Sequence, residues 1–535
     1  MSFSSTNVEY KATNAFSKIV TDYIDHAKAL DDFYSFRPDL KGIEEAIEQR
    51  KNFPVNRQLL TARLKEQYSS VEISEKLSAN IDALLSEDAF TVCTAHQPNI
   101  FTGHLYFIYK ILHAIKLSDE LNLASSSNKF VPVYYMGSED ADLDELGEVH
   151  VFGSSYKWNT GQKGAVGRMK IDKAFISLIN EIESRIAVEP YGKEIMASVR
   201  NAYKEGETVE KATFSFVHEL FNEFGLVIVL PDHADFKRSF STAIKKELNE
   251  KFSEKAVSIT AAAFPREYKV QAAGREINLF YLKDDIRERI EADANGFKIV
   301  NTDLYFTVAE MELELKSNPE RFSPNVILRP VFQELILPDV VFIGGGGELA
   351  YWLELKKVFE AANVFFPVLM LRNSFALIEK TSAELLAKLG LDSVDIFRAD
   401  KELTDEIVKK NSSLQLDLVS EKQSLLHVYA TVQKHASAID PTLNRHTEAL
   451  QTKALKYIDG LEKKMLRAEK RKFDAQQRQL AKLRSALNPG GSLQERHDNI
   501  LQYLSKYGTG FLKTLYDHSL AAEQKFTIIT EMDNG

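Results

Sequence analysis

Imidazole, amide and glycine groups are concentrated in one short stretch of the chain, from Ala95 to Tyr106. The run before it, Phe90–Thr94, is apolar and β-branched and predicts a buried strand. From Leu105 onward, apolar residues recur at helical spacing. A polar turn between the carboxyl end of a strand and a helix N-terminus is where α/β sheets bind ligands, and the free N–H groups there favour phosphate or carboxylate. An ordinary turn with Thr102 as the helix cap explains the same pattern equally well.

A second polar turn holds carboxylates. Gly137–Glu145 follows the apolar run Phe130–Met136 and contains Glu139, Asp140 and Asp142. Strand, helix and strand at this spacing predict a βαβ unit and therefore a parallel sheet. Carboxylates at a strand end are costly unless they are solvated or neutralise a cation, an amine or a metal. We interpret them as acid–base or amine-binding candidates, with a solvated acidic loop as the alternative.

Four consecutive glycines form a third signal. Gly344–Gly347 follow the apolar run Val340–Ile343 and precede a helix expected over Leu349–Phe359. No Lys-Ser or Lys-Thr follows, so this is not a P-loop, and the dinucleotide spacing GxGxxG fails at Leu349. The glycines therefore indicate either a phosphate cradle or a tight turn. Further core strands are expected at Leu226–Leu230 and Phe366–Leu371, with the core resuming at Val326–Pro330.

Composition narrows the class of protein. The 535 residues carry a formal net charge of -10, with 44% hydrophobic and 27% charged residues, as in a soluble globular protein. The negative charge argues against nucleic-acid binding by general electrostatics. The single cysteine, Cys93, excludes an internal disulfide and lies in an apolar run, which favours a packing thiol. We expect no metal, no signal peptide and no membrane span, and hence a cytoplasmic protein.

The chain divides into three parts by pattern. Residues 1–400 are expected to form an α/β core with insertions at 152–215 and 235–325. Residues 401–487 show coiled-coil spacing, a break at Asp440-Pro441 and a phase slip near Lys472, which predict an antiparallel helical hairpin. Its second helix is basic. Three interpretations fit this charge: the helix is solvated, it faces the acidic body of a partner, or it faces a nucleotide phosphate. Residues 488–535 are expected to form helices that pack back on the core, beginning at a capping box, Ser492–Glu495.

These motifs, together with Arg329-Pro330, Glu348–Trp352 and Leu493–Arg496 with Asn499, resemble the cysteine-adding enzyme family of bacillithiol biosynthesis. The resemblance covers about residues 90–510. It implies a Rossmann-like parallel-sheet core of the nucleotidylyltransferase and class I synthetase type, two connecting insertions and a coiled-coil hairpin that makes a homodimer. The implied activity is that of a ligase that joins L-cysteine to the amine of glucosaminyl malate, with ATP or ADP as a nucleotide ligand. The chain departs from the superfamily at Phe101, where the His-x-Gly-His signature has its first histidine, and no Lys-Met-Ser-Lys-Ser-like loop follows the last strand.

On this resemblance the amide-forming reaction activates the cysteine carboxylate, most simply as an adenylate. The catalytic candidates are His96, His104, Glu139, Asp140 and Asp142. The candidates for binding substrate or nucleotide are Gln97, Asn99, Thr102, Gly103, Tyr106, Arg329, Gly344, Gly345, Gly346, Gly347, Glu348, Tyr351, Trp352, Arg496 and Asn499. Two other functions fit the same sequence: a nucleotidyl-transfer enzyme of the superfamily with another acceptor, and a non-catalytic dimeric scaffold that binds nucleotide.

Overall fold

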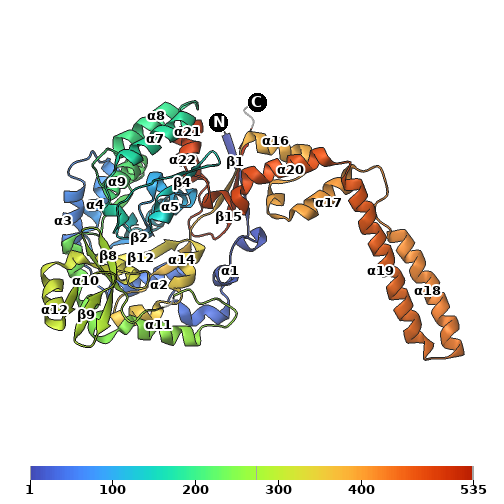
Figure 1. Ribbon diagram of the computed structural model, residues 1–535, viewed down its shortest axis with the longest axis horizontal. Coiled ribbons are helices and arrows are strands. Elements are labelled where there is room, and N and C mark those ends of the chain that lie inside the picture. Colours follow the sequence, from blue (N-terminus) through green and yellow to red (C-terminus); the bar gives the residue numbers. More distant parts are fainter. Residues whose placement is uncertain (1, 273, 533–535) are drawn as a thin grey trace. The chain divides into compact units, whose positions relative to one another are not determined.

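A five-stranded sheet of order β13-β12-β2-β3-β6 organises the larger part of the chain (Figure 1). All four strand pairs are parallel. The computed structural model describes residues 2–272 and 274–532. The strands are β2 (Ala89–His96), β3 (Lys129–Met136), β6 (Val227–Val229), β12 (Asp339–Gly344) and β13 (Val368–Leu371). Both faces of the sheet are covered, which is why these strands are continuous apolar runs in the sequence. The predicted parallel sheet is confirmed.

The strand order reverses between β2 and β12. From β2 the chain proceeds outward to β3 and β6, then returns to place β12 on the other side of β2, followed by β13. Ligands of open α/β sheets bind at such a switch point, outside the carboxyl ends of the strands. The turns after β2, β3 and β12 are the three polar stretches singled out in the sequence, and the topology brings them to one edge of the sheet.

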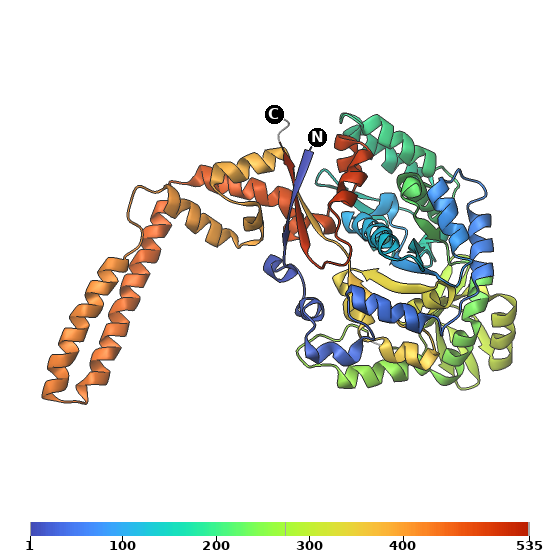
Figure 2. The ribbon, with the colours of Figure 1, turned by 180° about the vertical axis from the view of Figure 1, so that it is seen from behind.

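The helix α5 (Leu105–Ala124) connects β2 to β3 and packs on both strands. It shares one buried apolar cluster with α2 (Leu40–Arg50), β12 and β13, including Ala114, Ile47 and Val341. Figure 2 shows the parallel sheet from behind with these helices against it. The other elements before β2 are β1 (Ser2–Val8), α1 (Lys18–Ile24), α3 (Arg57–Gln67) and α4 (Glu75–Ala83). None of the described helices has the combined length and apolarity that a bilayer crossing requires.

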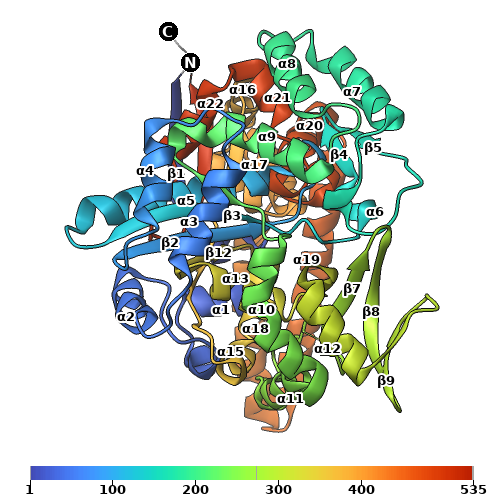
Figure 3. The ribbon, with the colours of Figure 1, turned by 90° about the vertical axis from the view of Figure 1, so that its left-hand side faces the viewer.

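Two insertions interrupt the parallel sheet. The first contains α6 (Leu143–Leu146), β4 (Glu148–Val151), β5 (Ser154–Lys157), α7 (Lys173–Ile186), α8 (Gly192–Ala202) and α9 (Val209–Phe221). The second contains α10 (Ala234–Glu250), α11 (Phe252–Ala263), β7 (Leu279–Lys283), β8 (Ile286–Asp293), β9 (Gly296–Ile299), β10 (Tyr305–Thr307), α12 (Val308–Ser317) and β11 (Phe322–Pro324). Its strands form an antiparallel sheet of order β10-β9-β8-β7-β11, with the β8–β9 hairpin turning at Ala294-Asn295 (Figure 3).

The segment between the second insertion and β13 differs from the sequence prediction. The run Val326–Pro330 leads into a helix, α13 (Arg329–Ile336), with Pro330 in its first turn, and forms no strand. The single helix expected over Leu349–Phe359 is two helices, α14 (Gly346–Trp352) and α15 (Lys356–Ala362). Between them the Glu354 carboxylate accepts the backbone N–H groups of Gln271 and Ala272, at 2.7 and 2.8 Å. The chain therefore turns at this contact, although the helical pattern of apolar residues in the sequence runs through it without a break.

The chain contains two compact units. One comprises residues 5–376 and 492–529, and the other comprises 1–4, 377–491 and 530–535. The second unit starts earlier than the position 400 taken from the sequence, because α16 (Lys380–Leu389) packs on α20 (Asp474–Leu487). It also holds α17 (Asp400–Asn411) and the antiparallel pair α18 (Val419–Ile439) and α19 (Leu443–Lys470). α19 ends at the predicted phase slip, and Lys422 of α18 is 2.7 Å from Asp459 of α19.

The C-terminal part of the core unit contains α21 (Leu501–Tyr507) and α22 (Gly510–Asp517). β15 (Phe526–Met532) lies between β1 and β14 (Phe375–Ile378) in a three-stranded sheet. The predicted capping box at Ser492–Glu495 is wrong. Glu495 lies in a short 3-10 helix, fully buried, and its carboxylate pairs with Arg372. The Glu495 carboxylate, which the motif would place at a helix N-terminus, is instead bound in this ion pair.

A strained turn joins β2 to α5. Phe101, Thr102 and Gly103 all have left-handed backbone angles, with φ of 51°, 70° and 64°. This conformation is costly for phenylalanine and a β-branched threonine. Thr102 therefore does not cap α5, whose N-cap is His104 with no side-chain capping bond. The Asn499 amide stabilises the turn because its Nδ2 donates to the carbonyl oxygens of Phe101, at 2.9 Å, and Gly103.

We predict that Asn499→Ala destabilises the core unit by about 2 kcal/mol or more, because two buried carbonyl groups lose their donor. The free energy of unfolding from urea titration measures the loss. Asn201→Ala, at an exposed position of α8, is the control and is expected within about 0.5 kcal/mol of wild type. Equal stabilities for the two variants would show that the turn holds its conformation without the amide.

Candidate functional site

A cavity of about 570 Å³ lies at the carboxyl ends of β2, β3 and β12, at the switch point of the sheet. Every residue that lines it belongs to the core unit. Twelve of the residues selected from the sequence line this cavity: His96, Gln97, Tyr106, Glu139, Asp140, Arg329, Gly345, Gly346, Gly347, Glu348, Tyr351 and Arg496. The fold thus brings together three turns that are separated by up to about 250 residues in the chain.

The other candidates lie outside the lining. Thr102 and Gly103 form the strained turn, and Asn499 bonds to it. Asn99 is buried beside the same turn, where its side chain would meet a Cβ at Gly103. Asp142 is the N-cap of α6 and accepts the backbone N–H of Glu145 at 3.2 Å.

Of the three remaining candidates, Trp352 and Gly344 are part of close packing, and His104 contacts another histidine. Trp352 is fully buried and stacked on Phe342 with ring centroids 4.1 Å apart. A Cβ at Gly344 would lie 2.9 Å from Leu349 and 3.0 Å from Phe342, so this glycine is required by close packing. The Nδ1–H of His104 donates to the carbonyl oxygen of His497, 3.1 Å away, and burial lowers the pKa of His104.

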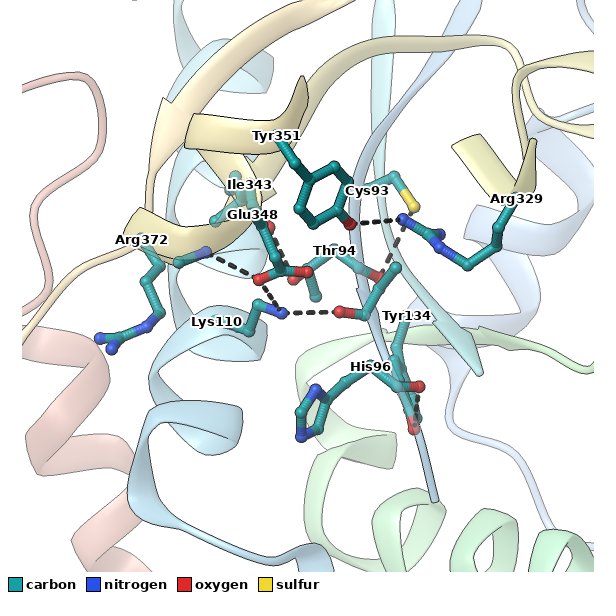
Figure 4. A network of polar contacts seen from close by, with 12 residues as sticks. Cys93, Thr94, His96, Lys110, Tyr134, Arg329, Ile343, Glu348, Tyr351 and Arg372 are labelled. Carbon is teal, nitrogen blue, oxygen red and sulfur yellow. Dashed lines mark hydrogen bonds and ion pairs between the residues drawn. The ribbon is translucent and has the colours of Figure 1, made fainter. Parts of the chain in front are cut away.

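A buried ammonium group forms one wall of the cavity (Figure 4). Lys110 of α5 is 1% exposed, donates to the carbonyl oxygen of Ala95 at 2.7 Å and pairs with the Glu348 carboxylate at 2.5 Å. Glu348 in turn accepts the backbone N–H of Gly345 at 2.8 Å. Burial lowers the pKa of Lys110, and the adjacent carboxylate opposes that shift. The pair fixes the glycine turn against the end of β2.

A second cation on this side is Arg372, which follows β13. Its guanidinium makes two bonds to the Glu495 carboxylate, at 2.8 and 2.7 Å, in the bidentate geometry that favours arginine. The remaining Nε–H is buried and has no hydrogen-bond partner among the described residues. It lies next to Gly345, where an added Cβ would be 3.6 Å from it. This donor is available to an anion in the cavity.

Arg329 approaches the same cavity from α13. It bonds to Gln333 at 3.0 Å and to the Tyr351 hydroxyl at 3.5 Å, and it lies over the ring of Tyr135 at 5.6 Å. None of these three partners carries a negative charge at neutral pH. Together with Lys110 and Arg372, it gives this half of the cavity an excess of positive charge.

The opposite wall is acidic. Glu139 is buried and forms an ion pair with Lys237 of α10, whose ammonium also donates to the carbonyl oxygen of Phe322 at 2.8 Å. Burial raises the pKa of Glu139 while Lys237 opposes the shift. Asp140 accepts a hydrogen bond from Gln97 at 3.1 Å and from the backbone N–H of Ala141 at 2.7 Å. Asp140 therefore presents a carboxylate that is hydrogen-bonded by neutral donors, with the Arg287 guanidinium 4.0 Å away.

Behind this wall, burial raises the pKa of Glu210 to about 8, with the Asp232 carboxylate adding to the shift. His96 lies on the opposite flank, between the rings of Tyr106 and Phe107 at 5.4 and 5.3 Å. Burial, reinforced by Lys110, lowers the pKa of His96 well below its usual value, so its imidazole is neutral at pH 7. A neutral imidazole can accept or donate a proton, but it adds no charge to the cavity.

The Cys93 thiol does not line the cavity. Cys93 is fully buried in β2, where desolvation raises its pKa far above the usual value, as expected for a packing thiol. The described residues contain no group of three or more His, Cys, Asp or Glu side chains placed to hold a metal ion.

Several residues that line the cavity or support its lining were not among the candidates predicted from the sequence. Lys110 is a lone cation in a helix that is otherwise apolar at that end, and Lys237 lies at helical spacing with Phe240 and Ile244. A lysine on an apolar helix face is a usable signal for a buried ion pair. Arg372 follows a strand of four apolar residues, so it too was detectable. Arg287 and Glu495 lack such a local signal because their roles depend on contacts distant in sequence.

Comparison with known proteins places the chain in a family. The family described as "Bacillithiol biosynthesis BshC, N-terminal Rossmann-like domain" matches residues 1–373, and "Bacillithiol biosynthesis BshC, C-terminal coiled-coil domain" matches residues 375–531. The chain belongs to the BshC family. This confirms the expected family, the Rossmann-like core and the coiled-coil part, whose boundary lies close to the division between the two compact units.

Relatives named "Putative cysteine ligase BshC" cover nearly the whole chain. The protein from Cytophaga hutchinsonii is 37% identical over 94% of both chains, and that from Flavobacterium johnsoniae is 36% identical over 98% of this chain and 99% of its own. A solved structure from Campylobacter jejuni, named "putative arginyl t-RNA synthetase", covers 88% of this chain and 100% of its own at 10% identity. Its TM-score of 0.24 carries no argument. The relatives are named as cysteine ligases, and by this membership of the family the chain is a ligase that forms a carbon–nitrogen bond.

We predict that Gly345→Val weakens ATP binding without lowering the melting temperature of the free protein. Gly345 has φ of -74°, and a Cβ there would make only ordinary contacts, at 3.5 and 3.6 Å, so the chain geometry tolerates it. The larger side chain would occupy the cavity beside Arg372. Calorimetric titration with ATP measures the affinity, and thermal unfolding measures stability.

Gly344→Ala is the matched control, because its Cβ would clash with the side chains of Leu349 and Phe342. It is expected to lower the melting temperature. If Gly345→Val instead loses as much stability as Gly344→Ala and the remaining folded protein binds ATP normally, the glycine serves chain geometry alone.

Proposed function

We propose that this BshC chain joins the carboxyl group of L-cysteine to the amine of glucosaminyl malate, after activating the carboxylate with ATP. The observation that supports this most directly is the division of one cavity into a cationic wall, with Lys110 and Arg372, and an acidic wall, with Glu139 and Asp140. A carboxylate and an amine are the two groups that such walls would bring together.

The cationic wall would hold the cysteine carboxylate and the phosphate that activates it. The unpartnered Nε–H of Arg372 points to an anion beside Gly345, and Lys110 places a positive charge behind the same turn. These groups fit a nucleotide phosphate as well as a carboxylate. Bound ATP would supply the adenylyl group that converts the carboxylate into a reactive acyl adenylate and releases pyrophosphate.

The acidic wall would orient the amine and take its proton. Asp140 faces the cavity with its carboxylate held by Gln97, so it can accept a hydrogen bond from an amine. Attack of the neutral amine forms the amide C–N bond, releases AMP and transfers one proton from nitrogen to a base. Glu139 is held by Lys237 and fixes the position of this wall.

The direct experiment combines purified protein with L-cysteine, glucosaminyl malate and each nucleoside triphosphate in turn, and follows products by mass spectrometry. The proposal predicts the amide product together with AMP when ATP is present. Product with ADP and phosphate would replace the adenylate by an acyl phosphate. No amide with any nucleotide would remove the proposed reaction.

We predict that Asp140→Asn lowers kcat/KM for the acceptor by about tenfold to a hundredfold, since a charge-assisted hydrogen bond to the amine is lost. Steady-state assays in glucosaminyl malate give the value. Asp142→Asn is the paired variant: it removes a carboxylate of the same loop that caps α6 outside the cavity. It is expected to stay within about threefold of wild type and to change the stability little, because asparagine caps a helix N-terminus about as well as aspartate. The opposite order of the two effects would make Asp142 the functional carboxylate.

We also propose a homodimer formed through the α18–α19 pair. Leu450, Tyr457 and Leu461 lie at coiled-coil spacing on α19 and are 44, 70 and 53% exposed. On α18, Val428, Val432 and Ile439 form a similar stripe and are 55, 47 and 84% exposed. Apolar stripes of this length on a protein surface usually pack against a partner, and a symmetric pair is the commonest arrangement.

Replacing Tyr457 and Leu461 together by lysine should yield monomers, because two unpaired charges would enter a dry seam at several kcal/mol each. Sedimentation at micromolar concentration measures the association state, and circular dichroism checks the helices. Both positions are exposed in the single chain, so the pair α18–α19 should stay folded. A wild-type protein that sediments as a monomer would exclude the dimer.

A further inference from the structure

A second cavity of about 300 Å³ opens beside the first in the core unit. Asp140, Arg287, Asn325 and Val326 line both cavities, so the two are adjacent across a shared wall. The second cavity differs in charge. Arg275, Arg287 and Arg289 line it, and Asp140 is its one carboxylate.

The antiparallel sheet of the second insertion positions two of these arginines. Arg287 and Arg289 are two residues apart in β8 and therefore lie on one face of the sheet. Arg289 is directly opposite Phe280 of β7 in the strand register. The guanidinium of Arg287 stacks on the ring of Phe280, 4.1 Å from its centroid. The contact with the aromatic ring fixes the position of this guanidinium at the cavity.

Arg287 is buried with few acceptors. Its side chain is 12% exposed, its Nε donates to the Ser323 hydroxyl at 3.4 Å, and its distance to the Asp140 carboxylate is 4.0 Å. A guanidinium has five N–H donors. By comparison, the buried Arg372 makes two close bonds to Glu495, and the partly exposed Arg168 makes two to Asp232. Arg287 is thus a buried cation whose ion pair with Asp140 is long, at 4.0 Å.

We propose that this arginine cavity binds the dicarboxylate group of the acceptor substrate. The inference rests on the proposed function and adds the place where the acceptor is recognised. Three guanidinium groups provide planar, paired N–H donors that match carboxylate geometry. The glycine turn that is suited to the nucleotide lies on the other side of the first cavity, beside Arg372.

The geometry also fits the connectivity of the acceptor. In glucosaminyl malate the amine and the malate group are on neighbouring carbons of the sugar ring. Asp140 and Arg287 are neighbours on the shared wall, with their charged groups 4.0 Å apart. An amine bonded to Asp140 in the first cavity would therefore place the adjacent malate carboxylates at Arg287 and Arg289 in the second. One ligand would bind in both cavities and give Arg287 a closer counter-ion than Asp140.

The test measures acceptor binding and turnover separately in Arg287→Gln and Arg289→Gln. Calorimetric titration of the full chain with glucosaminyl malate, without cysteine or nucleotide, should show a Kd at least about tenfold higher in each variant. Glucosamine, which lacks the dicarboxylate, should bind wild type and variants alike. Free L-malate should compete with glucosaminyl malate on wild type and lose that ability in the variants.

Lys298→Gln is the matched control, because it removes one positive charge from β9 of the same sheet and lies outside the cavity lining. It should bind glucosaminyl malate as wild type does. Circular dichroism confirms that each variant is folded, and Arg289, with a side chain 39% exposed, is the variant that tolerates replacement best. If Arg287→Gln does not fold, Arg289→Gln alone decides the result.

The outcomes separate this inference from the proposed function. Wild type that binds glucosaminyl malate through these arginines but forms no amide would leave the dicarboxylate site standing and overturn the reaction. Amide formation with an unchanged Kd and KM for the acceptor in both arginine variants would overturn the dicarboxylate site alone. A loss of ATP affinity in the variants with unchanged acceptor affinity would assign the arginine cavity to nucleotide phosphates, and wild type that does not bind glucosaminyl malate would overturn both proposals.

Discussion

The buried ammonium of Lys110 is the interaction on which the candidate site depends. It joins α5, the end of β2 and the glycine turn before α14, because it bonds to the Ala95 carbonyl and to Glu348, which holds Gly345. Removing one partner of a buried ion pair typically costs about 3–5 kcal/mol, since the other charge is left without compensation. This ion pair therefore joins the end of β2 to the turn after β12, the two strands between which the order reverses, in addition to their pairing in the sheet.

Residues in the C-terminal part of the core unit hold two parts of the site in place. Glu495 neutralises most of Arg372 and leaves its Nε–H toward the cavity, while Asn499 holds the left-handed turn at Phe101 and Gly103. Neither contact adds a group that would react with a substrate. Both hold groups beside the cavity in place, because Glu495 fixes Arg372 and Asn499 fixes the turn after β2.

The sequence was sufficient for the elements whose signal is local. β2, β3, β6, β12 and β13 are continuous apolar runs because the parallel sheet is covered on both faces, and the turns after β2, β3 and β12 could be located from them. Roles that depend on distant contacts were not predictable in this way. Glu495 matches a capping box, yet it pairs with Arg372, 123 residues away.

The same limit applies to individual side chains at the site. Asp140 and Asp142 are equivalent by sequence, but the chain turns so that the first lines the cavity and the second caps α6. Thr102 has the residue type of a helix cap, but the left-handed turn moves the cap to His104. In each case a local motif competes with a tertiary contact, and the tertiary contact determines the outcome.

In the sequence, most of the second unit is inserted between two parts of the core unit, and this affects the order in which the core is synthesised. Residues 5–376 leave the ribosome before residues 377–491, and the segment 492–529 that completes the core comes after both. At about 5–20 residues per second, the inserted unit separates the two by roughly 6–23 s. During that interval Arg372 lacks Glu495, and the turn at Phe101 lacks Asn499. The nascent core therefore lacks Glu495, Arg496 and Asn499 until the hairpin has been translated.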